Sequence, residues 1–197
     1  MKNTDVALEL ISSCGGYLTS TEAATHGIKN VTLQRMTNSG QLERIARGLY
    51  VLPDVIPDPF IVAQHRCPKG VFSHETALFL HDLSDRVPLR PMMTIPNGWN
   101  SKMLKDGEVL FFYSKTSWME LGVCKVTLPS ELAVWAFNKE RTLCDCLRSI
   151  EKLDRDLVVS ALKKYAKSPE RDNAKLIEYA DTLNIRDLVY RYMEVLI

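Results

Sequence analysis

The 197-residue chain lacks the long apolar segments that membrane insertion or secretion would require. It has no uninterrupted apolar run of about 18 residues, as a membrane-spanning helix would need, and no secretory h-region. Its five cysteines are scattered and odd in number, which argues against a disulfide framework and fits a reducing compartment. These absences predict a soluble, cytoplasmic protein that makes no membrane contact.

The chain also lacks an overall excess of charge. Its 25 Lys and Arg residues nearly balance 24 Asp and Glu residues, so the formal net charge is +1. A charge this small gives no general attraction to nucleic acid. Any affinity for DNA must therefore come from local basic patches.

Motifs of the common enzyme classes are missing as well. The sequence contains no P-loop, no Gly-rich dinucleotide turn, no HExxH and no GxSxG. It also lacks the Gly-Ser pair and spaced aspartates of a nucleotidyltransferase. Cys144 and Cys146 would lie about 200° apart on a helix, and His74 and His81 roughly 10 Å apart along one, so neither pair can chelate one metal ion. We predict that the chain is not an enzyme, needs no metal or cofactor, and uses these histidines structurally, while a contact of the histidines with a partner or nucleic acid stays open.

A helix-turn-helix pattern opens the most informative segment that is present. Ser20 or Thr21 can cap a short helix, and Asn30 can cap a second helix over residues 31–39. A glycine follows each helix, where it can adopt the left-handed conformation that helix ends favour. Two short helices about three residues apart, with glycine in the turn, are typical of a helix-turn-helix.

A hairpin pattern follows this pair of helices. Residues 42–45 and 49–52 are strand-like, and residues 46–48 can form the tight turn between them. A mostly apolar helix is expected earlier, over residues 4–13. The order of these elements predicts a winged helix-turn-helix domain over residues 1–52.

The second helix of this domain is the expected recognition helix. Val31, Leu33 and Met36 are expected to pack inward, which leaves polar side chains on the outer face. Arg can form two hydrogen bonds with guanine, and Asn or Gln with adenine, in a major groove that admits a helix. From Lys29 to Arg47, four basic residues stand against one acidic residue, so phosphate contacts are expected beside the base contacts. The predicted DNA-binding residues are Thr21, Lys29, Asn30, Thr32, Gln34, Arg35, Asn38, Arg44 and Arg47. The alternative, a solvated surface on a structural or protein-binding winged helix, stays open.

A proline-rich stretch marks the expected domain boundary. Residues 53–59 contain three prolines, which suit neither a helix interior nor a sheet, and they form the predicted linker. Asp58 as cap and Pro59 at the first helical position then open a helix to about Arg66. Residues 60–197 form the predicted second domain.

In the second domain, apolar residues first recur with a period of two, as in strands, and further along the chain with the period of a helix. Strands are predicted at residues 92–95, 109–113, 124–128 and 133–137, and helices at residues 139–150, around 157–165, around 176–183 and at 185–197. The predicted fold class is therefore α+β, with an N-terminal winged helix-turn-helix and a C-terminal domain of a small, mostly antiparallel sheet with a helical bundle. Arg141 and Asp145, four residues apart on one helix, are expected to form a surface or interdomain ion pair.

The helical part carries a basic face. Between Lys139 and Lys175, ten basic residues stand against seven acidic ones. Such a face is usually just solvated, but it is also a candidate for phosphate contacts that carry no sequence information. The candidates for these secondary DNA contacts are Lys163, Lys164 and Lys167.

Three segments together resemble the AbiEi-type antitoxins. The first is the wing, GQLERIARGLYV at residues 40–51. The second is SHETAL at residues 73–78 with His81 and the following Arg-Val-Pro, and the third is ERTLCD at residues 140–145. The resemblance spans nearly the whole chain, and the three segments in this order are more specific than the wing alone. The residues of the second domain that it marks are Ser73, His74, Glu75, His81, Arg141 and Asp145.

The resemblance implies a bacterial type IV toxin–antitoxin system linked to abortive infection by phage. An antitoxin of this kind represses its own operon through the winged helix, and its C-terminal domain opposes a nucleotidyltransferase toxin without needing a stable complex. The sequence shows no heptad seam on which to dimerise, so we expect a monomer in solution. Such a repressor would then bind operator DNA with inverted repeats, one copy to each half-site.

Two other functions stay open at this level. The first is a winged-helix transcriptional regulator whose C-terminal domain senses a ligand or a partner. The second is an enzyme that carries a DNA-binding appendage. A small molecule retained on purification would favour the regulator, and metal-dependent turnover of nucleotide or nucleic acid would favour the enzyme.

Overall fold

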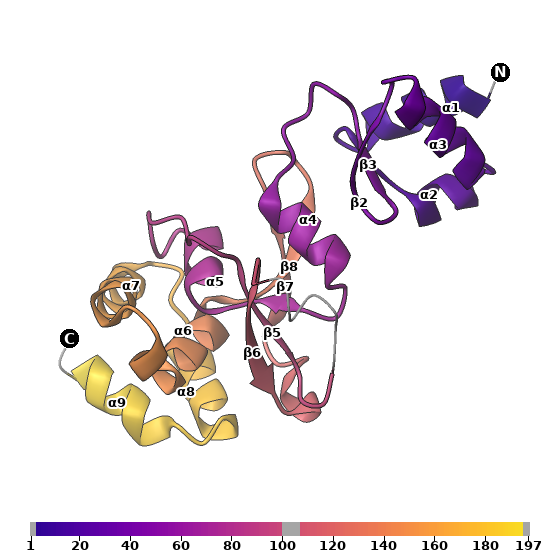
Figure 1. Ribbon diagram of the computed structural model, residues 1–197. Helices are drawn as coiled ribbons and strands as arrows, with labels where there is room; N and C mark the ends of the chain where they lie inside the picture. The colour runs from indigo at the N-terminus through magenta and orange to yellow at the C-terminus, as the bar shows by residue number, and fades with distance from the viewer. Residues whose placement is uncertain (1–2, 100–106, 195–197) are drawn as a thin grey trace. The chain divides into compact units, whose positions relative to one another are not determined.

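The computed structural model describes residues 3–99 and 107–194, and these divide into two compact units (Figure 1). The first unit contains residues 1–68 together with residues 127–133. The second unit contains residues 69–126 and 134–197. Within the described residues, no helix combines the length and the apolar character needed to cross a bilayer.

The first unit has the predicted winged helix-turn-helix. Its elements are α1 (Asn3–Ser13), β1 (Tyr17–Thr19), α2 (Ser20–Thr25), α3 (Asn30–Asn38), β2 (Glu43–Ala46), β3 (Leu49–Val51) and α4 (Pro59–Arg66). β3 lies between β1 and β2 and pairs with both in antiparallel fashion. The hairpin β2–β3 is the wing, and the added strand β1 ties it to the start of α2.

An apolar core holds the helices of this unit together. Ala7 and Ile11 of α1 pack against Leu33 and Met36 of α3 and against Leu42, and all five side chains are almost fully buried. The helical spacing of Leu33 and Met36 puts them on one face of α3, so burying that face fixes which side chains point outward.

Three expectations about the two short helices were wrong. Thr19, not Ser20 or Thr21, caps α2: its hydroxyl accepts a hydrogen bond from the backbone of Glu22, and the Glu22 carboxylate accepts one from the Thr19 backbone. This reciprocal pair needs a carboxylate three residues after the cap, and only Thr19 has that spacing.

The cap of α3 and the orientation of Val31 also differ from the prediction. Lys29 occupies the cap position without a side-chain hydrogen bond, and Asn30 is the first helical residue. Val31 is 64% exposed, because the core-facing stripe of α3 is set by Leu33 and Met36 instead. An apolar side chain therefore lies on the outer face of the helix.

The proline-rich stretch is part of the first unit. The backbone N–H of Leu52 donates to the carbonyl of Gly16 (3.1 Å), and that of Asp58 donates to the hydroxyl of Tyr17 (2.7 Å). Asp58 caps α4 as expected, accepting from the backbone N–H of Phe60 (2.8 Å). The expected segments, 1–52, 53–59 and 60–197, therefore do not coincide with the compact units, because these contacts place α4 with the winged helix.

The second unit is built on a five-stranded sheet. Its strands are β4 (Val71–Phe72), β5 (Met92–Pro96), β6 (Leu110–Ser114), β7 (Val123–Thr127) and β8 (Ala133–Phe137). The order is β6-β5-β4-β8-β7, with β4 antiparallel to β5 but parallel to β8, and β5 parallel to β6. The sheet is thus mixed where mostly antiparallel pairing was expected, since the two-residue strand β4, too short to give a period, lies between β5 and β8.

Helices make up the rest of the second unit, and the expected C-terminal helices are confirmed. They are α5 (His74–Leu80), α6 (Lys139–Arg148), α7 (Arg155–Lys167), α8 (Asn173–Thr182) and α9 (Arg186–Glu194), with single turns η2 (Thr116–Trp118) and η3 (Ile150–Lys152). The last predicted helix was expected to reach residue 197, and residues 195–197 lie outside the described part of the chain.

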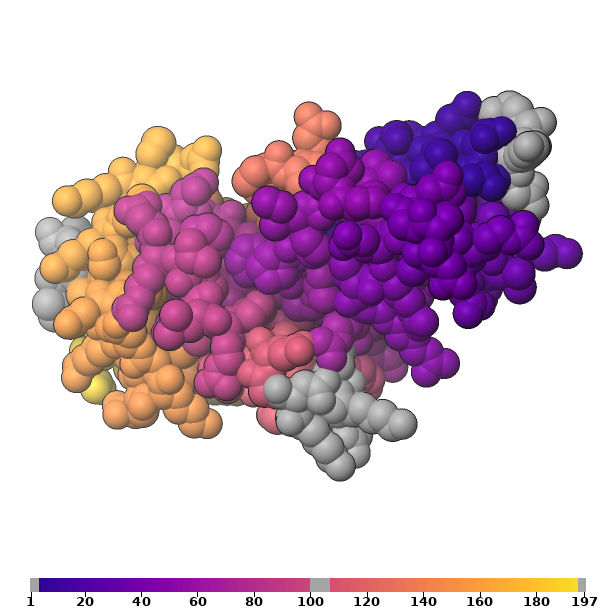
Figure 2. Space-filling model, turned by 45° about the horizontal axis from the view of Figure 1, so that its top comes forward, coloured from indigo at the N-terminus to yellow at the C-terminus, as the bar shows by residue number. Residues whose placement is uncertain are grey.

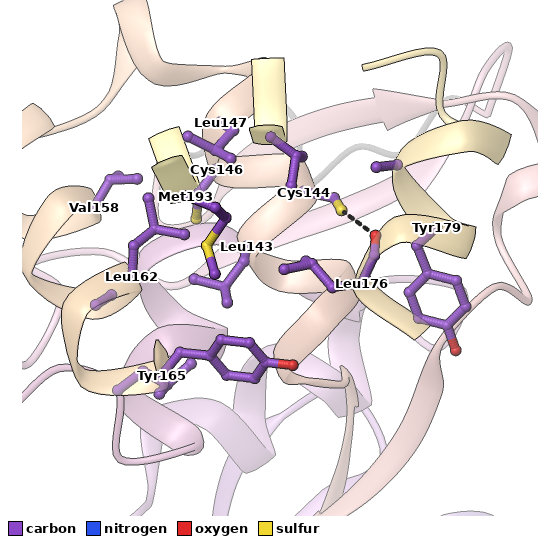
Figure 3. Close-up of a cluster of buried hydrophobic side chains, with 14 of the residues drawn as sticks. Leu143, Cys144, Cys146, Leu147, Val158, Leu162, Tyr165, Leu176, Tyr179 and Met193 are labelled. Atoms are coloured by element: carbon purple, nitrogen blue, oxygen red, sulfur yellow. Dashed lines mark hydrogen bonds between the residues drawn. The ribbon is translucent and has the colours of Figure 1, made fainter. Parts of the chain in front are cut away.

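Helix α6 is the centre of the second core (Figure 3). Leu143 and Leu147 pack with Leu162 of α7, Leu176 of α8 and Met193 of α9. All eight residues from Glu140 to Leu147 are buried, polar ones included. Because α6 is enclosed on every side, its polar side chains must find partners inside the protein.

Candidate nucleic-acid interface

Helix α3 and the wing enclose a hollow of about 650 Å³, which we call the α3–wing groove. Its lining residues share polar or small side chains, apart from one tyrosine. They are Ser20, Asn30, Gln34, Thr37, Asn38, Arg44, Arg47, Gly48 and Tyr50. The groove lies wholly within the first unit.

The helical side of the groove follows from the spacing of its residues. Asn30, Gln34, Thr37 and Asn38 occupy positions i, i+4, i+7 and i+8, which share one face of an α-helix. This face lies beside the buried stripe formed by Leu33 and Met36. Three of the four side chains carry amides, which can both donate and accept hydrogen bonds at the edge of a base.

The wing contributes positive charge. Arg44 and Arg47 are exposed and line the groove, and Lys29 and Arg35 are exposed on or beside α3. None of these four cations forms an ion pair with a residue in the described part of the chain. Arg44 is held only by a hydrogen bond from its Nε to the carbonyl of Ala46 (3.4 Å). The groove therefore presents positive charges that have no ion-pair partner among residues 3–99 and 107–194.

Hydrogen bonds fix the tip of the wing. The backbone N–H of Ser20 donates to the carbonyl of Gly48 (2.8 Å), and His65 Nε2 lies 3.1 Å from the carbonyl of Arg47. Gly48 has a φ of +75°, and a Cβ there would lie 3.1 Å from the hydroxyl of Ser20. Glycine thus permits both the turn and the close approach of α2 to the wing.

The structure brings some of the predicted DNA-binding residues together and leaves others apart. Asn30, Gln34, Asn38, Arg44 and Arg47 line the groove. The remaining predicted residues, which are exposed or half-buried and lie outside its lining, are Thr21, Lys29, Thr32 and Arg35. The residues of the groove that sequence reasoning missed are Ser20, Thr37, Gly48 and Tyr50. Thr37 could have been found from its helical spacing to Gln34, but the others come from the fold.

In the second unit, Ser73 and His74 lie together in a buried network. The hydroxyl of Thr94 donates to that of Ser73 (2.8 Å), and Ser73 Oγ lies 2.9 Å from His74 Nδ1. Burial, with the nearby Arg148, Arg141 and Lys152 cations, lowers the pKa of His74 to about 3. His74 is therefore neutral at physiological pH.

Glu75 and His81 lie at opposite ends of α5: Glu75 is in its first turn and His81 is its C-cap. Glu75 is half-buried and accepts from the backbone N–H of Asp154 (3.4 Å). His81 Nε2 donates to the carbonyl of Phe137 (2.7 Å), and burial lowers its pKa. Glu75 thus ties α5 to the start of α7, and His81 ties the end of α5 to β8. Within the described residues, no three His, Cys, Asp or Glu side chains are grouped to hold a metal ion.

The ion pair of Arg141 and Asp145 is buried, so the expected surface or interdomain position was wrong. Arg141 Nε lies 3.0 Å from Asp145 Oδ2, and both side chains are almost fully inaccessible. The guanidinium also donates to the carbonyls of Trp118 (2.7 Å) and Leu121 (3.1 Å) and lies over the ring of Phe137. Burial raises the pKa of Asp145, and Arg141 opposes that rise. The pair joins α6 to the turn before β7.

The basic face of α7 is on the surface of the second unit, orange in Figure 2. Lys163, Lys164 and Lys167 are all exposed. Lys164 Nζ lies 3.2 Å from Asp85 Oδ1, so one of the three charges already has a partner. Lys163 and Lys167 have no ion-pair partner among the described residues, so this face offers about as much free charge as the two arginines of the α3–wing groove.

Comparison with known proteins finds a family that is similar to the segment carrying the groove. Residues 5–53, from α1 through β3, match a family described as transcriptional regulators, AbiEi antitoxin. Residues 5–53 are thus similar to the AbiEi antitoxin regulators. This match confirms the resemblance over the winged helix, and residues 54–197 lie outside it. No curated protein matches the chain.

A solved structure shares the fold of nearly the whole chain. The crystal structure of the RV2827C protein from Mycobacterium tuberculosis superposes with a TM-score of 0.61, covering 96% of this chain and 80% of that one. The two sequences are 12% identical. At this identity the likeness concerns the fold alone.

Proposed function

We propose that this protein is a bacterial type IV antitoxin and the transcriptional repressor of its own toxin–antitoxin operon. The first unit binds double-stranded operator DNA through the α3–wing groove, and the second unit counters a nucleotidyltransferase toxin. The observation that carries the proposal is the groove itself. Amide side chains on α3 face two arginines that have no ion-pair partner among the described residues, within a segment similar to the AbiEi antitoxin regulators.

The chemistry of the groove matches that of a DNA duplex. Gln34 and Asn38 lie on the face of α3 that would enter the major groove, where amides pair with adenine. Arg44 and Arg47 are placed for phosphates or for the minor groove beside it. Phosphates would supply the missing partners of these charges, and binding would release counterions from the DNA.

The DNA-binding half of the proposal is tested by fluorescence anisotropy on the full-length protein. The probe is a duplex from the region upstream of its own gene, and a shuffled duplex of the same composition is the control. Tight binding to the upstream duplex over the shuffled one is expected, and Gln34→Ala should reduce that preference. Equal binding to both duplexes by the wild-type protein would refute sequence-specific repression.

The antitoxin half is tested by growth of cells that express the neighbouring gene as the toxin. Full-length protein should restore growth, and so should the variant Gln34→Ala combined with Arg47→Ala, although that variant no longer represses a reporter fused to the operon's promoter. This separation is expected because both substitutions lie in the first unit. Loss of protection and repression together would mean that the two activities share the groove.

The expected oligomeric state is tested by light scattering. A monomer at micromolar concentration is expected, with two copies on a duplex that carries inverted half-sites. A stable dimer in the absence of DNA would contradict this part of the proposal.

A further inference from the structure

A second hollow lies wholly within the second unit and plays no part in the proposed DNA contacts. Its volume of about 570 Å³ is in the usual range for small-molecule sites. We call it the His74 cavity. Its lining residues are His74, Thr94, Leu110, Phe111, Phe112, Tyr113, Arg148, Ser149 and Lys152.

A chain of hydrogen bonds orients one hydroxyl of this cavity. Ser73 Oγ accepts the hydrogen of Thr94, so its own hydrogen is left to donate to His74 Nδ1 (2.9 Å). The neutral imidazole then carries its proton on Nε2, which donates to Ser149 Oγ (3.2 Å). The hydrogen of Ser149 is therefore free to donate to another acceptor. Ser149 is in this way prepared as a hydrogen-bond donor on the wall of the cavity.

Two cations lie beside this hydroxyl. Arg148 ends α6 and Lys152 ends η3, four residues later, and both line the cavity. Lys152 is exposed and has no ion-pair partner in the described part of the chain, while Arg148 Nη2 lies 3.8 Å from Asp145 Oδ1. No acidic side chain is among the described residues that line the hollow. The two charged side chains that line the hollow are therefore both cationic, and after burial, the largest cause, they contribute to the lowered pKa of His74.

Part of the wall is aromatic. The ring of His74 stacks on Phe112 with centroids 3.5 Å apart and an angle of 18°. Phe112 lies opposite Thr94 in the sheet and shares its face, whereas its strand neighbours Phe111 and Tyr113 point to the other face. His74 has a φ of +52°, a left-handed conformation that is uncommon for residues other than glycine and is kept where the surroundings demand it. The hydrogen bonds and the stacking hold the imidazole in one orientation, so the donor at Ser149 is also fixed.

We propose that the His74 cavity binds the phosphate group of a small phosphorylated molecule. Arg148 and Lys152 balance the phosphate charge, and Ser149 Oγ donates a hydrogen bond to a phosphate oxygen. Phe112 of β6 contacts the part of the molecule that bears the phosphate. This site would give the second unit a ligand-sensing role, and it is independent of DNA binding by the first unit.

Titration calorimetry on the full-length protein tests the proposal with three probes: AMP, inorganic phosphate and adenosine. AMP is expected to bind at least about tenfold more tightly than adenosine, since a charge-assisted hydrogen bond is worth about a factor of ten or more. Inorganic phosphate should also bind. If it binds as tightly as AMP, the ligand is free phosphate, and if it binds more weakly, the ligand is a phosphate ester. Equal binding of AMP and adenosine, or no binding of either phosphate compound at millimolar concentration, would overturn the proposal.

Variants locate the binding within the cavity. Lys152→Gln and Ser149→Ala should each weaken AMP binding about tenfold, whereas Lys163→Gln, which removes the same charge from the exposed face of α7, should leave it unchanged. Lys152 is exposed, so its replacement leaves the fold intact, and unchanged tryptophan fluorescence checks this. Equal losses from Lys152→Gln and Lys163→Gln would show that only general charge attracts the probe, and would refute the site.

Discussion

The two units differ in whether their polar and charged side chains are exposed or buried. In the first unit the core is built from apolar residues such as Leu33 and Met36, while Arg44 and Arg47 are exposed and have no ion-pair partner among the described residues. In the second unit some charged side chains are buried, such as those of Arg141 and Asp145. Among the described residues, every buried polar or charged side chain, tyrosines aside, belongs to the second unit.

This difference teaches how to interpret a charged residue that a sequence motif singles out. An exposed, unpaired arginine costs the fold little and leaves its charge available to an outside partner. A buried arginine has lost its hydration and must be paired inside, so its first role is to hold the structure. Arg47 and Arg141 both belong to family-like segments, yet only Arg47 is placed to meet an external ligand.

The largest expected effect comes from breaking the buried pair. Arg141→Met leaves Asp145 buried without its partner and should lower the free energy of unfolding by about 3–5 kcal/mol. Urea unfolding followed by tryptophan fluorescence measures it, because Trp99, Trp118 and Trp135 all lie in the second unit.

Two controls sharpen this comparison. Arg47→Ala, in the first unit, should change the free energy of unfolding by less than about 0.5 kcal/mol. Arg141→Met combined with Asp145→Leu should recover part of the loss, since no unpaired charge remains. A cost below about 1 kcal/mol for Arg141→Met alone would contradict the structural role of the pair.

We next expect the surface arginines to differ in their contributions to DNA binding. Arg35→Ala should cost up to about 3 kcal/mol on the preferred operator and relax the preference at one or two base pairs, if Arg35 bonds to guanine. Arg47→Ala should instead weaken binding to all duplexes and reduce the slope of log K against log salt by about one. Anisotropy titrations at several salt concentrations on operator and shuffled duplexes separate the two. Identical behaviour of both variants would show that all surface arginines act through phosphates alone.

The second unit should also lose stability in acid because His74 is buried and neutral. Below pH 6.5 the unfolded chain takes up a proton on this residue that the folded chain excludes until about pH 3, so stability falls as the pH falls through that window. From pH 7 to pH 5 the loss attributable to His74 is about 2 kcal/mol.

Urea titrations of wild-type protein and His74→Gln at the two pH values measure this loss. The difference between the two proteins isolates His74, because the lowered pKa of His81 and the raised pKa of Asp145 remain in both. A wild-type protein that loses no more stability than the variant would show that His74 titrates freely in the folded state.

The smallest expected effect concerns Val31, the exposed apolar residue of α3. At 64% exposure it has no packing role, and it lies one turn from Arg35, so we expect it to contact a thymine methyl group. Replacing the operator thymines one at a time with uracil should weaken wild-type binding by about 1 kcal/mol at one position. Val31→Ala should be insensitive to that same replacement. A uracil effect of equal size in both proteins would assign the methyl contact elsewhere.

The sequence predicted the first unit well because its polar and apolar residues follow the period of each element. The helix over residues 4–13, the helix-turn-helix and the wing are all confirmed, and the groove residues Gln34 and Asn38 follow from helical spacing. The errors there are local. The cap of α3 is Lys29, one residue before the predicted Asn30. Val31 was placed wrongly because it lies two residues, about 200° around the helix, from the buried Leu33 and so cannot share its face.

In the second unit the elements were predictable but their environment was not. The strands and the C-terminal helices have clear periods, yet the polar residues of α6 suggest a solvated face that the structure does not have. Arg141 was placed at the surface for this reason. Likewise the parallel pairing of β4 with β8 depends on a two-residue strand that leaves no pattern in the sequence. The parallel pairing of β5 with β6 was missed because the period of a strand does not show its direction. The His74 cavity joins residues from α5, β5, β6 and the end of α6, which only the fold brings together.

The return of residues 127–133 to the first unit limits how this DNA-binding module can be exchanged between genes. Leu132 packs in the apolar cluster that contains Tyr17, Leu49 and Val51. It lies 64 residues after Pro68, where the first segment of this unit ends. A recombination event that transferred only residues 1–68 would leave this segment behind and open that cluster to water. Inheritance of the winged helix is therefore tied to inheritance of the hairpin between β7 and β8, and chimaeras between relatives should carry both or neither.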